Sequence, residues 1–175
     1  YDLTGGSRIG RFHRRLRAKS AYRHFPTMPE GKLASAYVYY DAEADDARLT
    51  LQVLKTAADH GAAILNYAEV VSLNIGDGGR VDGARIDSDG EIIDVRAKCV
   101  VSATGVWIDD VHEMESGNTS HTVRPAKGIH LTFDWNKIRN DIAVVIPVPK
   151  DRRSLFVVPW QPLGDGTYRY TYVGT

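Results

Sequence analysis

The sequence predicts a mixed α+β or α/β fold, in which a helix, a β-meander and a buried strand lead into a second β-sheet. A helical pattern of apolar residues near 46–60 is followed by three alternating stretches separated by glycine-rich turns. A continuous apolar stretch and several short alternating ones come next. The chain has 175 residues, 43% of them hydrophobic and 25% charged, which is enough to bury a core.

Composition and charge exclude several classes of protein. The 22 Lys and Arg residues balance 22 Asp and Glu residues, which argues against a dedicated nucleic-acid binder. The single cysteine, Cys99, excludes internal disulfides and a multi-cysteine zinc site, and the histidines show no metal-ligand spacing. No apolar run approaches the roughly 18 residues of a membrane span, and no signal peptide is visible. We therefore expect no metal and a reducing, cytoplasmic setting.

Residues 1–36 are predicted to form a basic arm. Pro26 ends a short helix that the spacing of Ile9, Phe12 and Leu16 predicts over residues 10–19. The charge suits either a solvated face against an acidic partner domain or contact with anionic lipid headgroups. Seven cations lie between residues 8 and 23 without an acid among them: Arg8, Arg11, Arg14, Arg15, Arg17, Lys19 and Arg23.

Local signals define the helix and the meander. Asp45 is a natural N-cap for a helix over about 46–60, and Gly61 ends it. Residues 62–66 are predicted as a short buried strand. The meander strands are expected over 69–75, 80–86 and 91–96, where Asp89-Gly90 supplies a tight hairpin turn.

A different kind of strand is predicted over Lys98–Ala103, because its continuous apolar centre is typical of a strand covered on both faces. It ends in Ala103-Thr104-Gly105, small residues that either admit a ligand close to the backbone or make an ordinary strand-to-helix turn. A short helix over 106–114 and a polar loop over 115–121 follow. The second sheet is expected to take its strands from 123–133, 142–147, 155–158 and 168–173, with a loop or hairpin over 147–153.

Five short motifs occur in order along residues 40–175: DDARL at Asp45–Leu49, ATGVW at Ala103–Trp107, KGIH at Lys127–His130, FVVPW at Phe156–Trp160 and YVGT at Tyr172–Thr175. Together they resemble the FAD-dependent glycerol-3-phosphate dehydrogenases, in the D-amino-acid-oxidase-like group of flavoproteins. The resemblance implies part of an FAD-binding Rossmann-like domain at 37–114, which leads into a mixed β-sheet substrate domain beginning at 115–175.

The resemblance implies oxidation of sn-glycerol 3-phosphate to dihydroxyacetone phosphate by hydride transfer to FAD, with the electrons passed on to quinone. It adds peripheral attachment to the inner face of the cytoplasmic membrane, for which the Arg8–Arg23 arm is a candidate surface. The family's G-x-G-x-x-G phosphate-binding motif does not occur in these 175 residues. We therefore expect a middle fragment that does not hold FAD alone and is inactive in isolation.

The resemblance also implies the site. His130 is the candidate catalytic base, since a histidine can accept a hydroxyl proton near neutral pH; the alternative is a structural histidine of the sheet. Thr175 is expected near the substrate, and Trp107 and Trp160 in the core. The residues expected to contact FAD are Val70, Ala103, Thr104, Gly105, Lys127 and Gly128.

Two other functions stay open at this point. One is a different flavoprotein oxidase of the same fold, such as an amino-acid oxidase, against which the DDARL and KGIH motifs argue. The other is a non-catalytic binding domain, in which the meander and the basic arm recruit a partner.

Overall fold

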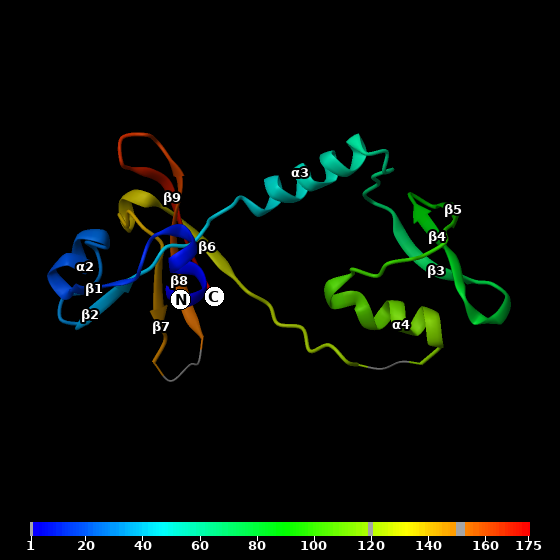
Figure 1. The fold of residues 1–175 in the computed structure, drawn as a ribbon, viewed down its shortest axis with the longest axis horizontal. Helices are drawn as coiled ribbons and strands as arrows, with labels where there is room; N and C mark the ends of the chain where they lie inside the picture. Colours follow the sequence, from blue (N-terminus) through cyan, green and yellow to red (C-terminus); the bar gives the residue numbers. More distant parts are fainter. Residues whose placement is uncertain (1, 119–120, 150–152) are drawn as a thin grey trace. The chain divides into compact units, whose positions relative to one another are not determined.

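A computed structural model describes residues 2–118, 121–149 and 153–175 (Figure 1). The chain divides into two compact units, each described by itself. The sheet unit comprises residues 1–43 and 127–175, and the meander unit comprises residues 44–126. Helices and β-sheets occur in the chain as the sequence predicts, so the mixed α/β class is confirmed. Parts of two predicted loops, residues 119–120 and 150–152, lie outside the described residues.

The sheet unit is built on a four-stranded sheet in the order β6-β9-β8-β7, with every neighbouring pair antiparallel. Its strands are β6 (His130–Asp134), β7 (Val144–Pro147), β8 (Ser154–Pro162) and β9 (Tyr168–Gly174), and a short 3₁₀ turn, η4 (Trp135–Lys137), follows β6. All four predicted strands are present. The first of them, β6, begins at His130, and residues 123–129 form no strand. The central strands β8 and β9 carry the buried Val157 and Thr171.

The predicted helix over residues 10–19 is wrong. The N-terminal segment instead contains a π-helical turn η1 (Asp2–Gly6), α1 (Ser7–Ile9), β1 (Arg14–Arg17), α2 (Ala18–His24) and β2 (Ser35–Val38). Gly10, at a φ of 64°, ends α1, and β1 pairs antiparallel with β2. Because the β2 partner lies some twenty residues away in sequence, local periodicity could not reveal this pairing. Ile9 and Phe12 are exposed and Leu16 is half-buried, so the three apolar residues that suggested a helix do not form one buried face.

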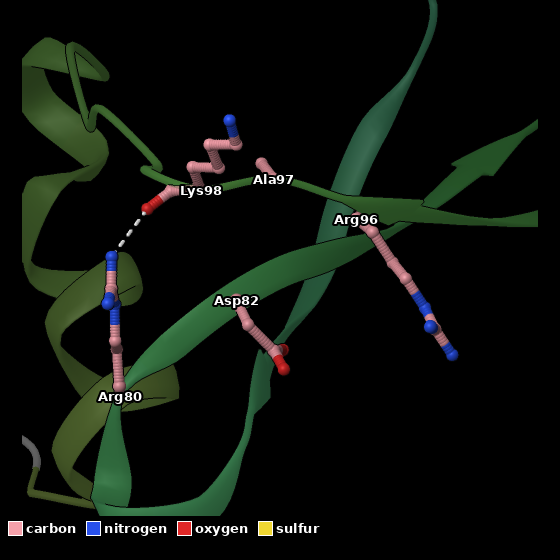
Figure 2. A pocket seen from close by; sticks show the side chains of 5 residues that line it. All are labelled: Arg80, Asp82, Arg96, Ala97 and Lys98. Atoms are coloured by element: carbon pink, nitrogen blue, oxygen red, sulfur yellow. Dashed lines mark hydrogen bonds between the residues drawn. The ribbon is translucent and has the colours of Figure 1, made fainter.

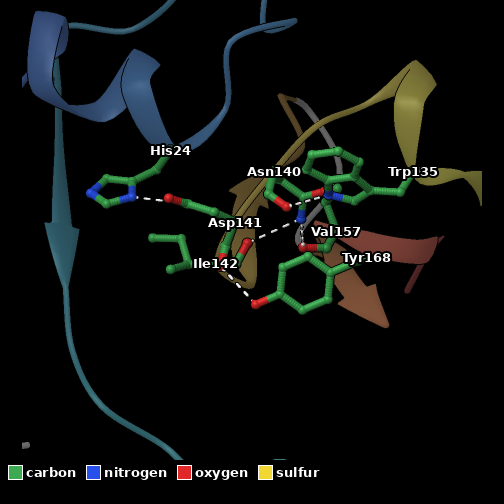
Figure 3. Close-up of polar contacts among 7 residues, drawn as sticks. All are labelled: His24, Trp135, Asn140, Asp141, Ile142, Val157 and Tyr168. Atoms are coloured by element: carbon green, nitrogen blue, oxygen red, sulfur yellow. Dashed lines mark hydrogen bonds and ion pairs between the residues drawn. The ribbon is translucent and has the colours of Figure 1, made fainter. Parts of the chain in front are cut away.

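Helix α2 is joined to the sheet by polar contacts (Figure 3). His24 Nδ1 lies 2.9 Å from Asp141 Oδ1, and the Asp141 backbone N–H donates to the His24 carbonyl at 3.2 Å. The Thr27 hydroxyl donates to the Ile138 carbonyl at 2.6 Å. These contacts fix the end of α2 against residues 138–141 of the sheet unit.

The meander unit confirms the predicted helix and hairpins. Helix α3 (Asp46–Asp59) begins after Asp45, whose carboxylate accepts from the Arg48 backbone N–H at 3.1 Å. Strands β3 (Glu69–Ile75), β4 (Val81–Ser88) and β5 (Glu91–Arg96) form one antiparallel sheet in chain order, with a short 3₁₀ turn η2 (Asp77–Gly79) between β3 and β4. The β4–β5 turn has Asp89 at φ 54° and Gly90 at φ 85°. These are the positive φ values that a two-residue hairpin requires.

Two strand predictions in this unit are wrong. Residues 62–66 and 98–103 form no strand, and Val101 is 82% exposed. A strand exists only when a neighbouring strand satisfies its backbone groups, and no described strand pairs with either segment. Apolar composition alone therefore does not establish these two strands.

The short helix after Ala103-Thr104-Gly105 is confirmed. A 3₁₀ turn η3 (Gly105–Trp107) continues into α4 (Ile108–Ser116). Trp107 is 66% exposed, so its predicted core position is wrong within the described residues. Trp160 is half-buried, and its ring centroid lies 5.5 Å from that of Tyr172.

Candidate functional site

The KGIH and YVGT segments, more than forty residues apart in sequence, lie side by side in the sheet unit. His130, the first residue of β6, stands directly opposite Gly174, the last residue of β9. A Cβ placed on Gly128 would lie 3.0 Å from the Thr175 carbonyl oxygen. The structure therefore brings Gly128, His130 and Thr175 together at one end of the sheet, and Lys127 precedes them in the same segment.

The His130 side chain is exposed, and its ring lies close over the Cα of Gly174. Among the residues that the structure describes, none forms a hydrogen bond with the His130 ring. The geometry thus leaves both nitrogens accessible to an incoming molecule.

The other predicted site residues belong to the meander unit. The Thr104 carbonyl accepts from the Trp107 backbone N–H at 3.2 Å, and the Thr104 and Ser102 hydroxyl oxygens lie 3.2 Å apart. Gly105 has a φ of 57°, and a Cβ placed on it would meet no atom within 4 Å. Its left-handed backbone favours glycine, and the space above it is open.

Val70 lies on β3 opposite Ile86, and its side chain is 37% exposed. The register of the β3–β4 pair shifts directly after it, between Val70 and Ser72. Helix α4, which Ala103-Thr104-Gly105 precedes, contacts β3. Val70 thus lies on a strand that contacts the helix beginning shortly after the small residues.

Asp109, in the first turn of α4, holds the chain beyond the helix. Its carboxylate accepts from the Thr122 hydroxyl, from the Thr122 backbone N–H at 3.0 Å and from the Val123 backbone N–H at 3.2 Å. The Thr122 hydroxyl and the Val123 N–H are the main causes that lower the pKa of Asp109 below its usual value of 3.8. The ionised carboxylate therefore fixes residues 122–123 against the helix that follows the small-residue turn.

An open cavity of about 450 Å³ lies elsewhere in the meander unit (Figure 2). Arg80, Asp82, Arg96, Ala97 and Lys98 line it. The Arg80 guanidinium donates to the Lys98 carbonyl at 3.0 Å, so this side chain braces the start of β4 against the chain that follows β5. Figure 2 shows the Arg96 side chain pointing away from those of Arg80 and Lys98. None of the predicted site residues lines this cavity.

No group of three His, Cys, Asp or Glu residues suited to a metal ion occurs in residues 2–118, 121–149 and 153–175. Within the same ranges, no helix is both long enough and apolar enough to cross a membrane.

Sequence reasoning did not assign a role to Gly174 or to the Asp109 contacts. Gly174 is buried between two neighbouring strands, which a glycine inside an alternating strand pattern can indicate. The Asp109 contact with Thr122 and Val123 spans a loop, so no pattern of neighbouring residues in the sequence predicts it. Of the predicted site residues, His130 meets Gly174 through the register of β6 on β9, and Gly128 lies just before this pairing, close to the Thr175 carbonyl oxygen.

Comparison with known proteins gives a consistent result. The family model described as FAD dependent oxidoreductase (DAO) matches residues 5–175. Mitochondrial glycerol-3-phosphate dehydrogenase of Bos taurus is 38% identical over 171 residues, which cover 93% of this chain and 23% of that protein. Glycerol-3-phosphate dehydrogenase of Mycobacterium leprae (strain TN) is 34% identical over 162 residues, or 91% of this chain and 27% of that protein.

A solved structure is also similar. The glycerol-3-phosphate dehydrogenase from Bacillus halodurans complexed with FAD superposes with a TM-score of 0.75 at 29% identity, over 91% of this chain and 31% of that chain. The chain thus spans between about a quarter and a third of the length of these proteins.

Proposed function

Because this chain belongs to the FAD dependent oxidoreductase family, we propose that it is a segment of an enzyme that oxidises sn-glycerol 3-phosphate to dihydroxyacetone phosphate. The names of the relatives, which are 34–38% identical, support this substrate. The observation that carries the proposal is the pairing of His130 with Gly174, which places an accessible imidazole beside Gly128 and Thr175. Residues arranged in this way suit the binding of a small hydroxylated substrate and the removal of a proton from it.

The residues present fit contacts to FAD at two places. Gly105 offers exposed backbone with open space where a Cβ would stand, next to Ala103 and Thr104. Lys127 and Gly128 are likewise exposed, and the Lys127 cation suits an anionic group of the cofactor. Val70 is the weaker contact in this proposal. FAD, when bound, supplies the acceptor for the substrate hydride.

In this proposal, two residues of the chain have specific roles in the reaction. His130 accepts the proton of the substrate C2 hydroxyl as the C2 hydride leaves, so that the carbonyl of dihydroxyacetone phosphate forms without a build-up of negative charge. Neutral imidazole is the form that accepts the proton. Thr175 supplies a hydroxyl at the same end of the sheet and would orient the substrate.

We include two further parts in the proposal. Electrons leave the enzyme to a membrane quinone, and the enzyme works in the cytoplasm, attached peripherally to the inner face of the membrane. The exposed arginines of β1, Arg14, Arg15 and Arg17, support an attachment of this kind because they suit anionic headgroups.

The test is a substrate comparison with the full-length protein. Purified full-length protein should be yellow and should reduce a quinone analogue with glycerol 3-phosphate, but not with D- or L-amino acids. Residues 1–175 alone should show no flavin absorbance near 450 nm, because the G-x-G-x-x-G motif is not among them. Turnover of amino acids in place of glycerol 3-phosphate, or a fragment that is yellow and active, would contradict the proposal.

A further inference from the structure

Gly174 occupies an unusual position in the sheet. It is a buried residue of the inner strand β9, flanked by His130 on β6 and by Phe156 on β8. Its φ is not in the left-handed region, so the backbone conformation does not call for glycine. The reason for a glycine must therefore lie in what surrounds it.

The surroundings leave no room for a side chain. A Cβ on Gly174 would overlap His130 Cδ2 and the Ile129 carbonyl oxygen, and would lie 3.0 Å from His130 Cγ. Two opposite residues of an antiparallel pair point to the same face of the sheet, so the imidazole lies in the space that a side chain at 174 would take. Any larger residue must displace the His130 ring, the β6 backbone or both.

We propose that Gly174 is a positioning residue for His130: its missing side chain leaves the space against β9 that the imidazole occupies, and so fixes where the ring nitrogens face. This inference rests on the proposed function, in which His130 takes a proton from substrate. A base acts only when it lies within hydrogen-bond reach of the proton, and a misplacement of about 1 Å can cost roughly 10²-fold in rate.

The experiment compares Gly174→Ala with Gly83→Ala in the full-length protein. Gly83 is the matched control, since it is also a buried strand glycine whose Cβ would overlap a backbone carbonyl, that of Val95, but it lies in the meander unit. Steady-state kinetics with glycerol 3-phosphate give kcat and KM. The rate at which diethyl pyrocarbonate modifies His130, followed by mass spectrometry, reports the exposure of the ring independently of activity.

Gly174→Ala should lower kcat by about 10- to 100-fold and change KM by less than about threefold, because proton transfer depends on ring position more than binding does. It should also change the rate of His130 modification. In a His130→Ala background, Gly174→Ala should lower kcat by less than about twofold, since its effect on rate passes through the ring. Gly83→Ala should leave kcat and the modification rate unchanged.

Other outcomes decide against one proposal or the other. If His130→Ala abolishes turnover while Gly174→Ala keeps the original kcat and modification rate, the positioning role is overturned. If the full-length protein does not oxidise glycerol 3-phosphate but Gly174→Ala still changes the modification rate, the proposed function fails and the positioning of the ring stands. If Gly174→Ala does not fold, folding restored by adding His130→Ala supports the ring contact, and no restoration assigns Gly174 a purely structural role.

Discussion

The Thr171 hydroxyl donates a 3.0 Å hydrogen bond to Asn140 Oδ1, and both side chains are fully buried in the sheet unit. The Asn140 amide nitrogen donates to the carbonyls of Ile142 and Val157, at 3.0 and 3.1 Å. The Trp135 indole N–H donates to the Asn140 carbonyl at 2.8 Å. This one asparagine therefore ties β8, β9 and the chain between β6 and β7 together.

Asn140→Ala should lower the free energy of unfolding of the full-length protein by about 2–4 kcal/mol, because it opens a cavity, removes the acceptor of the buried Thr171 hydroxyl and removes the amide donor to the Ile142 and Val157 carbonyls. Thr171→Val should cost about 1–3 kcal/mol, since only Asn140 Oδ1 loses its donor. Urea titration measures both. The exposed Thr56 on α3 is the control, and Thr56→Val should change stability by no more than about 0.5 kcal/mol. Equal midpoints for all three variants would show that the buried network contributes nothing.

His130→Ala in the full-length protein should lower kcat for glycerol 3-phosphate by about 10²-fold or more, because the proposed function makes this imidazole the base that takes the hydroxyl proton. Stopped-flow measurement of flavin reduction isolates this step from the later electron transfer. His60→Ala, at the exposed C-terminal end of α3, is the control and should keep the original rate. An unchanged rate of flavin reduction in His130→Ala would remove the role of base.

The lowered pKa of Asp109 predicts how the stability of the fold changes with pH. A carboxyl whose folded pKa lies below its unfolded value stabilises the fold above the unfolded pKa, near 3.8, and loses this contribution as pH falls through the folded pKa. Asp109→Ala should therefore lower the melting temperature at pH 7, and the gap to the original protein should close below about pH 4. Asp110→Ala, an exposed carboxylate of the same turn, is the control. A gap that stays constant from pH 7 to pH 3 would contradict the linkage.

Gly90→Ala should destabilise the β4–β5 hairpin by about 1–2 kcal/mol, because a Cβ at a φ of 85° clashes with the backbone. The Gly90 N–H donates to Asp87 Oδ1 at 2.8 Å, a contact that the strained turn would weaken. Hydrogen exchange of the β4 and β5 amides measures the loss, and Glu91→Ala serves as the exposed control. Unchanged protection in Gly90→Ala would mean that the turn adopts another conformation.

If the basic arm meets anionic lipid, the triple variant Arg14→Gln, Arg15→Gln, Arg17→Gln should bind phosphatidylglycerol vesicles at least tenfold more weakly, since each basic residue near such a surface contributes about 1 kcal/mol. Binding of the original protein should also weaken as salt rises, because salt screens exposed charges. The matched control replaces three exposed cations of the meander unit, Lys55, Arg85 and Arg96, with Gln. Vesicle binding that is unchanged both by added salt and by the arm variant would exclude these arginines as the lipid-binding surface.

Features set by neighbouring residues were accessible from the sequence. The Asp45 cap places the start of α3, because its carboxylate bonds a backbone N–H only three residues away. Asp89-Gly90 sets the β4–β5 turn, because the required positive φ values are a property of those two residues. The alternation over 69–75 and 91–96 likewise matches the bounds of β3 and β5.

Tertiary structure decided whatever depends on a distant partner. Residues 14–17 pair with 35–38 rather than continue a helix, and residues 98–103 remain without a strand neighbour among the described residues. The sequence by itself placed His130 in the KGIH motif and made it the candidate catalytic base. Only the register of β6 on β9 placed its ring over Gly174, because a backbone pairing across more than forty residues leaves no periodic trace in the chain.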